Sequence, residues 1–182
     1  MIKNPSEHKL TNLYLIGFMG TGKSSVGKVV AEKLGLRFID SDVEIEKETN
    51  LSVSQIFSSL GEAKFRDLEK NFINQGHPSS DCLISCGGGL PIQSGMMNIL
   101  KNKGHVFCLS ATPETIYHRT KNNSNRPLLQ SPAPMAKIKK LILEREEIYS
   151  QADHIISSEQ RSIQTMAEII IQKYREANDI NR

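Results

Sequence analysis

The segment 17–24, Gly-Phe-Met-Gly-Thr-Gly-Lys-Ser, constrains the fold of this chain more than any other. It follows the apolar run 13–16 and precedes the stretch 26–34, whose apolar residues recur at helical spacing. A G-x-x-x-x-G-K-[ST] spacing between strand and helix predicts a phosphate-binding loop, because glycines let successive N–H groups point at one anion. We expect Lys23 to reach the β- and γ-phosphates of a nucleoside triphosphate and Ser24 to bind magnesium. A plain strand-to-helix turn with a chance Lys-Ser pair is the alternative.

Apolar runs alternate along the chain with helically periodic stretches. Five runs are expected to be strands: 13–16, 36–39, 82–86, 104–109 and 154–156. The expected helices cover 26–34, 43–49, 52–59, a longer stretch from 61, 91–101, a stretch that begins at 112, 135–149 and 163–174. The alternation predicts an α/β fold in three layers, with helices on both faces of a five-stranded parallel sheet. Ligands of such sheets bind beyond the carboxyl ends of the strands.

No internal repeat or linker divides the chain, so we expect a single domain over residues 1–182. Within it, the stretch 120–134 is rich in Lys, Asn, Ser and Pro and has no periodicity. A segment of this length without structure of its own is usually functional in a compact domain. We therefore predict a mobile lid there.

The composition argues against several classes of function. The net charge is only +3, so no broad basic surface for nucleic acid is expected, and no apolar run is long enough to span a membrane. Residues 1–12 lack the apolar core of a signal peptide. The three cysteines are odd in number and lie in apolar runs, where cysteine is usually a small buried hydrophobe, which favours a reducing compartment. Cys82 and Cys86 lack redox or zinc spacing, which argues against a catalytic or metal-binding role. We expect a cytoplasmic monomer that acts on small molecules, without nucleic acid or membrane partners.

Two carboxylates, Asp40 and Asp42, follow the second expected strand. At that edge of the sheet they would lie near the magnesium ion and the γ-phosphate. One would hold the metal through water while the other accepts a proton from an acceptor hydroxyl. An extended backbone from 40 to 42 would send both side chains to the same side. The alternative is a helix cap, for which Asp is well suited.

Three further features suggest a small acceptor molecule. Arg66 stands beside an aromatic residue, Arg145 lies in an expected helix, and the glycines 87–89 follow a buried strand. Each arginine by itself is also typical of a solvated surface, and the glycines either form a plain turn or let the backbone approach a ligand closely. The sequence 102–105, Asn-Lys-Gly-His, lacks the aspartate of the guanine-specifying N-K-x-D motif, which argues against a switch GTPase.

Together these segments resemble the shikimate kinase family, small kinases of the nucleoside-monophosphate-kinase-like group of P-loop folds. The resemblance runs from about residue 13 to residue 149. Its motifs are 17–24, 38–42 (Phe-Ile-Asp-Ser-Asp), Gly61-Glu62 with Phe65-Arg66 and Glu69, 85–89 (Ser-Cys-Gly-Gly-Gly), 126–129 (Arg-Pro-Leu-Leu) and Arg145-x-x-x-Tyr149.

The resemblance implies a magnesium-dependent enzyme of aromatic amino acid biosynthesis that uses ATP to phosphorylate the 3-hydroxyl of shikimate, giving shikimate 3-phosphate and ADP. The implied catalytic residues are Asp42, Lys23 and Arg126, the last in the lid. The implied ATP-binding residues are Gly17, Gly20, Thr21, Gly22, Lys23, Ser24, Ser25, Arg119, Arg126 and Arg161. The implied shikimate-binding residues are Asp42, Arg66, Gly87, Gly88, Gly89, Arg145, Phe57, Phe65 and Glu69, many of them in a short helical region at about 42–70. The implied magnesium ligands are Ser24 directly and Asp40 through water.

Elementary chemistry agrees with these implied roles, since a planar guanidinium is suited to bidentate binding of a carboxylate such as that of shikimate. Two other functions remain open at this point. One is a sugar-acid kinase of similar fold, such as a gluconate kinase, whose substrate also carries a carboxylate. The other is a non-catalytic ATP-binding protein that has kept the fold.

Overall fold

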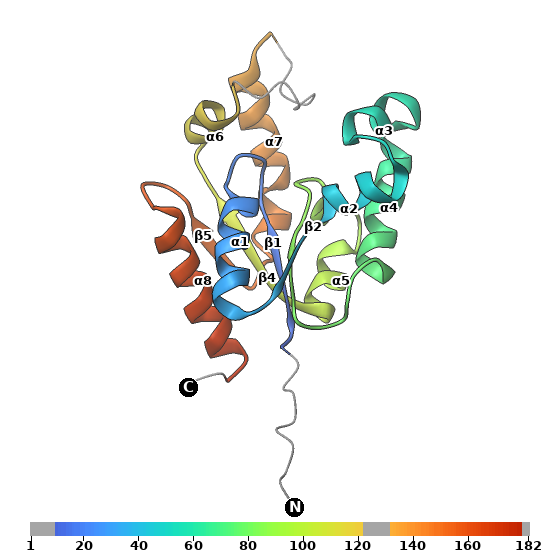
Figure 1. The fold of residues 1–182 in the computed structure, drawn as a ribbon. Coiled ribbons are helices and arrows are strands. Elements are labelled where there is room, and N and C mark those ends of the chain that lie inside the picture. The colour runs from blue at the N-terminus through green and yellow to red at the C-terminus, as the bar shows by residue number, and fades with distance from the viewer. Residues whose placement is uncertain (1–9, 122–131, 180–182) are drawn as a thin grey trace, which may run out of the picture.

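The computed structural model describes residues 10–121 and 132–179 of the chain (Figure 1). Its strands are β1 Asn12–Ile16, β2 Arg37–Asp40, β3 Cys82–Ser85, β4 Gly104–Ser110 and β5 His154–Ser157. Its helices are α1 Lys23–Leu34, α2 Ser41–Thr49, α3 Val53–Ser59, α4 Gly61–Gln75, the 3-10 helix η1 Leu90–Ile92, α5 Met96–Lys103, α6 Pro113–Thr120, α7 Pro134–Tyr149 and α8 Ile163–Ala177. None of these helices is both long and apolar enough to cross a lipid bilayer.

The sheet is parallel throughout, with the strand order β2-β3-β1-β4-β5. The first strand is therefore the central one, and Leu13 pairs with Leu83 on one side and His105 on the other. All five residues of β1 are buried, as expected for a parallel strand covered on both faces. The predicted α/β fold with a five-stranded parallel sheet is confirmed.

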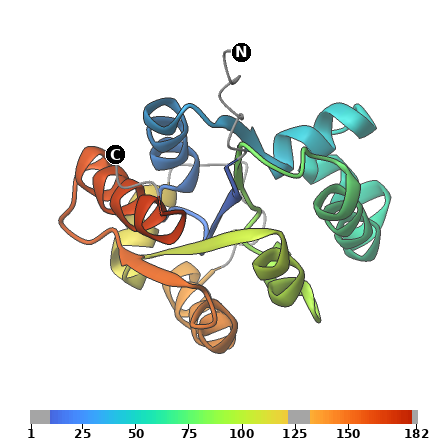
Figure 2. The same cartoon turned by 90° about the horizontal axis from the view of Figure 1, so that it is seen from below.

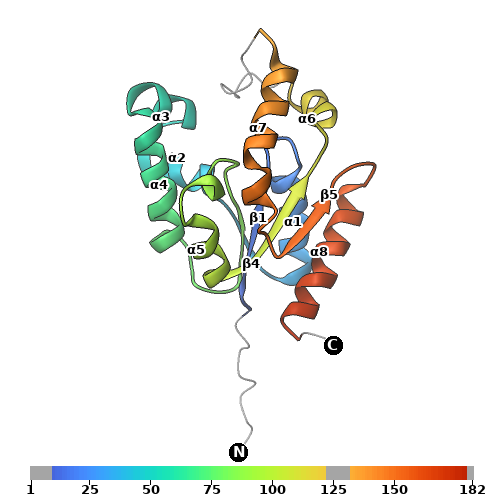
Figure 3. The ribbon, with the colours of Figure 1, turned by 180° about the vertical axis from the view of Figure 1, so that it is seen from behind.

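Two hydrophobic cores lie on the two faces of the sheet. Leu13 and Leu15 pack with α1 and α8, whereas Tyr14 and Ile16 pack with a core that includes α4, α5 and α7. This division follows from the period of two along a strand, because successive side chains point to opposite faces. Figures 2 and 3 show α1 and α8 on one side of the sheet and α5 and α7 on the other. The three-layer prediction is confirmed.

Local sequence signals explain most helix ends. Ser52 and Gln55 form a capping box at the start of α3, Thr112 caps α6 ahead of Pro113, and Gly35 ends α1 with a left-handed φ of 68°. The predicted helix 91–101 was wrong in its first half. Residues 90–92 form the 3-10 helix η1, and α5 begins only at Met96, because the backbone is extended at Gln93 and left-handed at Gly95.

The β1–β4 pair is tight enough to exclude a side chain at the start of β4. A Cβ on Gly104 would lie 2.1 Å from the carbonyl oxygen of Asn12, although φ at Gly104 is extended. We expect Gly104→Ala to lower the free energy of unfolding by about 1–3 kcal/mol through this overpacking. Urea unfolding would measure it. Gly95→Ala is the control, since a Cβ there meets no atom within 4 Å and only the left-handed torsion is penalised. An unchanged free energy of unfolding in Gly104→Ala would contradict the predicted overpacking, and Gly95→Ala shows how much a torsional penalty without a clash costs in the same protein.

Candidate active site

The predicted phosphate-binding loop connects the end of β1 to the start of α1. Gly20 and Gly22 have φ values of 79° and 97°, in the left-handed region that favours glycine, so the chain can curl around a central point. Thr21 is buried and its Oγ1 donates to the carbonyl oxygen of Phe18 at 2.8 Å, which stiffens the turn. No side chain caps the start of α1 at Gly22. The first N–H groups of α1 and its positive end are therefore directed at the same place.

Lys23, the first residue of α1, folds back over this loop. Its Nζ donates to the carbonyl oxygens of Gly17 at 2.9 Å and Phe18 at 3.1 Å. The ammonium group is thus held beside the amides that curl around the anion position. This geometry is suited to binding the phosphates of a nucleotide.

Ser24 and Asp40 meet at the edge of the loop. Ser24 Oγ donates to Asp40 Oδ2 at 2.8 Å, and Asp40 Oδ1 accepts from the N–H of Asp42 at 3.2 Å. Asp40 therefore caps α2 as well as facing the loop. The prediction of an extended backbone from 40 to 42 was wrong, because the helix already begins at Ser41 and places Asp42 in its first turn.

A magnesium ion fits this donor set. A hydroxyl and a carboxylate at hydrogen-bonding distance provide the hard oxygen ligands that Mg²⁺ prefers. Over residues 10–121 and 132–179 there is no group of three or more His, Cys, Asp and Glu side chains placed to hold a metal. Magnesium does not require such a cage, because it keeps several waters and takes further ligands from substrate phosphates.

Gly87 separates two acidic side chains. A Cβ on Gly87 would lie 2.6 Å from Asp42 Oδ1 and 2.8 Å from Glu69 Oε1. Both carboxylate oxygens therefore lie close to the same point beside the Gly87 backbone, and close to each other. The N–H of Gly87 donates to Ser41 Oγ at 2.9 Å, which joins the glycines 87–89 to the start of α2. A glycine is therefore required here to let two carboxyl groups approach the backbone.

Glu69 is fully buried, and its two oxygens have different surroundings. Oε2 accepts from Arg66 Nη1 at 2.7 Å and from Gln93 Nε2 at 2.8 Å, whereas Oε1 has no hydrogen-bond partner among the residues that the structure describes. Burial raises the pKa of Glu69 to about 7, against the opposing effect of the Arg66 charge, and nearby Asp42 adds to the rise. Glu69 therefore titrates near neutral pH.

The guanidinium of Arg66 is fixed on several sides. It bonds to Glu62 at 2.7 Å and to Glu69 at 2.7 Å, and its Cζ lies 5.9 Å and 5.6 Å from the ring centroids of Phe57 and Phe65. A Cβ on Gly89 would lie 2.5 Å from Arg66 Nη1. Arg66 therefore contacts the glycine segment 87–89, and the two phenylalanines form one wall beside it.

Arg145 of α7 reaches the same glycine segment from the other side. Its Nη1 lies 3.4 Å from the carbonyl oxygen of Gly88, and its Cζ lies 5.2 Å from the ring centroid of Phe18 in the phosphate loop. Two guanidinium groups, from α4 and α7, therefore converge on residues 88 and 89. A planar carboxylate between them would meet two cations and backbone amides.

Arg119 and Arg161 lie near the segment between β5 and α8. Arg119 Nη1 donates to the carbonyl oxygen of Gly20 at 3.2 Å and to Ser158 Oγ at 3.0 Å, so it joins α6 to the phosphate loop. Arg161 Nη1 donates to the carbonyl oxygen of Ser157 at 2.9 Å. Ser25 is exposed in the first turn of α1. Arg126 and most of the predicted lid, residues 122–131, lie outside the described residues.

Sequence reasoning missed two residues of this site. Ser41 accepts the hydrogen bond from Gly87, and Gln93 donates to Glu69. The position of Ser41 between two aspartates at a helix start is a usable signal in retrospect. Nothing local marks Gln93, because its partner lies on α4, and the contact arises only when η1 packs beside that helix.

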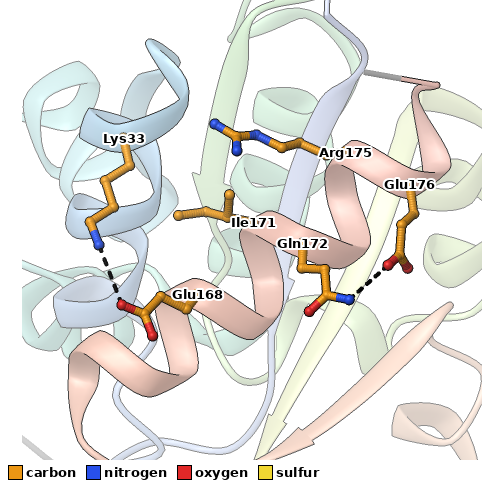
Figure 4. Close-up of a pocket in the computed structure, with 6 residues that line it drawn as sticks. All are labelled: Lys33, Glu168, Ile171, Gln172, Arg175 and Glu176. Atoms are coloured by element: carbon orange, nitrogen blue, oxygen red, sulfur yellow. Dashed lines mark hydrogen bonds and ion pairs between the residues drawn. The ribbon is translucent and has the colours of Figure 1, made fainter. Parts of the chain in front are cut away.

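A cavity of about 670 Å³ lies elsewhere, between α1 and α8 (Figure 4). Figure 4 shows Lys33 reaching from α1 to Glu168 on α8, with Nζ and Oε1 3.9 Å apart, and Gln172 bonded to Glu176. Lys33 is about 15 Å along α1 from the phosphate loop, at a rise of ~1.5 Å per residue. The phosphate loop is therefore not part of this cavity.

An anion-binding loop at the carboxyl end of the central strand, with acidic side chains beside it, places this protein among the P-loop kinases. The shikimate kinase family model matches residues 19–175. The shikimate kinase of Thermodesulfovibrio yellowstonii is 45% identical over 165 residues, which are 91% of this chain and 95% of that protein. The shikimate kinase of Persephonella marina is 46% identical over 153 residues, 84% of this chain and 92% of that protein.

A solved structure of another shikimate kinase has a similar fold. Shikimate kinase from Acinetobacter baumannii, in complex with shikimate, has a TM-score of 0.87 and 36% identity over 92% of this chain and 94% of that chain. The chain therefore belongs to the shikimate kinase family. The family resemblance inferred from the motifs is confirmed.

The buried Glu69 generates a prediction about stability and pH. Its pKa is about 7 when folded and near the ordinary 4.5 when unfolded, so the folded protein binds the extra proton between these values. Stability from this group is present at low pH and lost as pH rises through 7. We expect the wild-type free energy of unfolding to fall by about 2–3 kcal/mol relative to Glu69→Gln between about pH 5 and pH 8.

Chemical unfolding of both proteins across this pH range measures the difference. The comparison removes the contributions of groups that both proteins share, such as His77, whose pKa is lowered by burial. Parallel stability curves for wild type and Glu69→Gln would show that Glu69 does not titrate in this range.

Proposed function

We propose that this protein transfers the γ-phosphoryl group of ATP to the 3-hydroxyl of shikimate, giving shikimate 3-phosphate and ADP. The observation that carries the proposal is the convergence of Arg66 and Arg145 on the glycine segment 87–89, next to Asp42 and the phosphate loop. Shikimate carries one carboxylate and ring hydroxyls, and this arrangement offers partners for both. The Acinetobacter relative, whose structure is described as a complex with shikimate, supports the choice of substrate.

In this proposal the two arginines hold the acceptor in one orientation. Arg66 is already locked by Glu62 and Glu69, so little side-chain entropy is lost when it binds the carboxylate. Arg145 turns from its weak 3.4 Å contact with Gly88 to the other side of the carboxylate. Phe57 and Phe65 cover the apolar face of the ring. Positioning of this kind is most of what phosphoryl transfer requires from a protein.

Asp42 would bind the reacting hydroxyl and accept its proton. Its Oδ1 lies at the backbone of Gly87, the first glycine of the segment on which the two arginines converge. The transition state is loose, so the hydroxyl proton need not leave before the bond between the γ-phosphorus and the departing ADP breaks, and the binding role of Asp42 matters more than its basicity. Lys23 and the loop amides would hold the phosphates, and lid residue Arg126 would neutralise charge on them.

Magnesium would be held by Ser24 directly and by Asp40 through water. The bound ion supplies charge neutralisation on the β- and γ-phosphate oxygens. The remaining proposed ATP contacts are the loop residues Gly17, Gly20, Thr21 and Gly22, together with Ser25, Arg119 and Arg161. Arg119 is supported by its bond to the Gly20 carbonyl, which places it at the loop on the β5–α8 side.

We also propose one kinase domain with a lid over 120–134 that closes on the nucleotide, acting as a cytoplasmic monomer. All the residues assigned above come from one chain, so a second copy is not needed to complete the site. ATP and shikimate would be its small-molecule partners, and the low net charge of +3 argues against nucleic acid as a partner.

A coupled ADP-release assay tests the acceptor. With ATP and magnesium we expect turnover with shikimate and only background rates with gluconate, CMP and AMP. Gluconate lacks the ring that Phe57 and Phe65 are proposed to cover, and CMP and AMP lack a carboxylate for the two arginines. Phosphorylation of gluconate with shikimate inert would make the protein a sugar-acid kinase. Nucleotide binding without turnover on any acceptor would favour the non-catalytic alternative.

Asp40 and Asp42 provide a matched pair of substitutions for the mechanism. If Asp42 accepts the proton of the hydroxyl, Asp42→Asn should lower turnover by ~100- to 10,000-fold, the usual contribution of such a group, with a near-normal magnesium requirement. Asp40→Asn should instead raise the magnesium concentration needed for half-maximal rate, while Asn still caps α2. Initial rates over a magnesium titration distinguish the two. Near-normal turnover and shikimate binding in Asp42→Asn would remove both roles proposed for that residue.

A further inference from the structure

Tyr149, the last residue of α7, makes a contact that none of the assignments above uses. Its hydroxyl donates to the carbonyl oxygen of Gly88 at 2.8 Å, and its side chain is almost completely buried. Arg145, one helical turn earlier, reaches the same oxygen at only 3.4 Å. Residues four apart lie on one face of a helix, so α7 presents both side chains to one carbonyl group.

The Gly88–Gly89 peptide is unusually easy to rotate. A peptide flip changes ψ of the first residue and φ of the second, and glycine at both positions removes most of the steric barrier. In a peptide between two residues other than glycine, the Cβ atoms would restrict these torsions. An interaction with the carbonyl oxygen is therefore needed to select one orientation, and the short Tyr149 bond is the stronger of the two available.

Orientation of this carbonyl fixes an N–H group as well. In a planar trans peptide the C=O and the next N–H point in opposite directions. With the Gly88 oxygen held toward α7, the Gly89 N–H points away from α7, and Arg66 of α4 is in contact with the Gly89 backbone. Among the described residues no backbone or side-chain group accepts a hydrogen bond from this N–H.

We propose that Tyr149 is a positioning residue that holds the Gly88–Gly89 peptide in one orientation, so that the Gly89 N–H and Arg66 together bind the carboxylate of the acceptor. This inference rests on the proposed function for the identity of the acceptor. Arg145 cannot replace Tyr149, because in that function its guanidinium turns to the carboxylate and leaves the Gly88 oxygen. Tyr149 then remains the partner of that carbonyl throughout the reaction.

The hydroxyl of Tyr149 is suited to a permanent donor role. Burial raises its pKa to about 12, although the charge of Arg145 opposes the rise. The phenol therefore keeps its proton, and remains a hydrogen-bond donor, at every pH at which the protein works. In this it differs from Glu69, which titrates near neutral pH.

Tyr149→Phe tests the proposal, with Tyr174→Phe as its control. Tyr174 is also a buried tyrosine whose hydroxyl donates to a backbone carbonyl, that of Thr11, but it lies on α8 in the other hydrophobic core. We expect Tyr149→Phe to raise the KM for shikimate by about 5- to 20-fold, the range for one lost hydrogen bond to a positioned group. The KM for ATP and kcat should change less than about twofold, and Tyr174→Phe should leave all three constants near wild type.

A second measurement does not depend on turnover. In protein labelled with ¹⁵N-glycine, the Gly89 amide reports the hydrogen bond to the preceding carbonyl, because that bond polarises the whole Gly88–Gly89 peptide unit. Tyr149→Phe should shift this resonance and weaken its response to added shikimate, whereas Tyr174→Phe should do neither.

The outcomes separate this inference from the proposed function. An unchanged Gly89 resonance and unchanged KM in Tyr149→Phe would overturn the role of Tyr149 while shikimate phosphorylation stands. Equal kinetic losses in the two variants would mean a general structural effect, which also overturns it. If the wild-type protein does not phosphorylate shikimate, the proposed function is wrong. The ¹⁵N shift of the Gly89 amide would still decide whether Tyr149 fixes the Gly88–Gly89 peptide.

Discussion

The structure depends on the position of β1 between β3 and β4 at the centre of a parallel sheet. All five of its residues are buried, and its two faces support two separate hydrophobic cores. Since parallel strands end at the same edge, this arrangement brings the phosphate loop, Asp40 and the glycine segment 87–89 together, although they are far apart in the sequence. The chemistry of the site is therefore a consequence of strand order.

Charged side chains are also buried beside this edge of the sheet, which lowers the stability of the folded protein. Glu69 is buried with a raised pKa, one of its oxygens has no hydrogen-bond partner within residues 10–121 and 132–179, and it fixes Arg66 through Oε2. A buried carboxyl group is costly unless it is well paired, so stability alone does not explain its presence. Its effect is to hold a guanidinium in a fixed orientation at the backbone of Gly89, where a small acceptor is proposed to bind.

The features that were predictable from the sequence are local ones. The spacing of glycines with Lys23 and Ser24 specifies the loop, alternation of apolar runs specifies the layers, and Thr112 marks a helix start. The contacts that could not be predicted link elements distant in sequence. Ser41 bonds to Gly87, and Gln93 bonds to a glutamate on another helix, because helix packing rather than any motif sets those distances. The helix break at 93–95 was missed since an apolar-periodic pattern continues through it.

The close approach at the start of the phosphate loop has a consequence for how the protein is made. A Cβ on Gly17 would lie 2.2 Å from the carbonyl oxygen of Leu109, so the loop rests directly on the end of β4. A nascent chain that stops before Leu109 lacks both this support and one neighbour of β1. Long-range parallel pairing must wait for the later strand to leave the ribosome. The nucleotide pocket is thus complete only after the chain has been translated beyond Leu109, so its N-terminal phosphate loop reaches its final support late in synthesis.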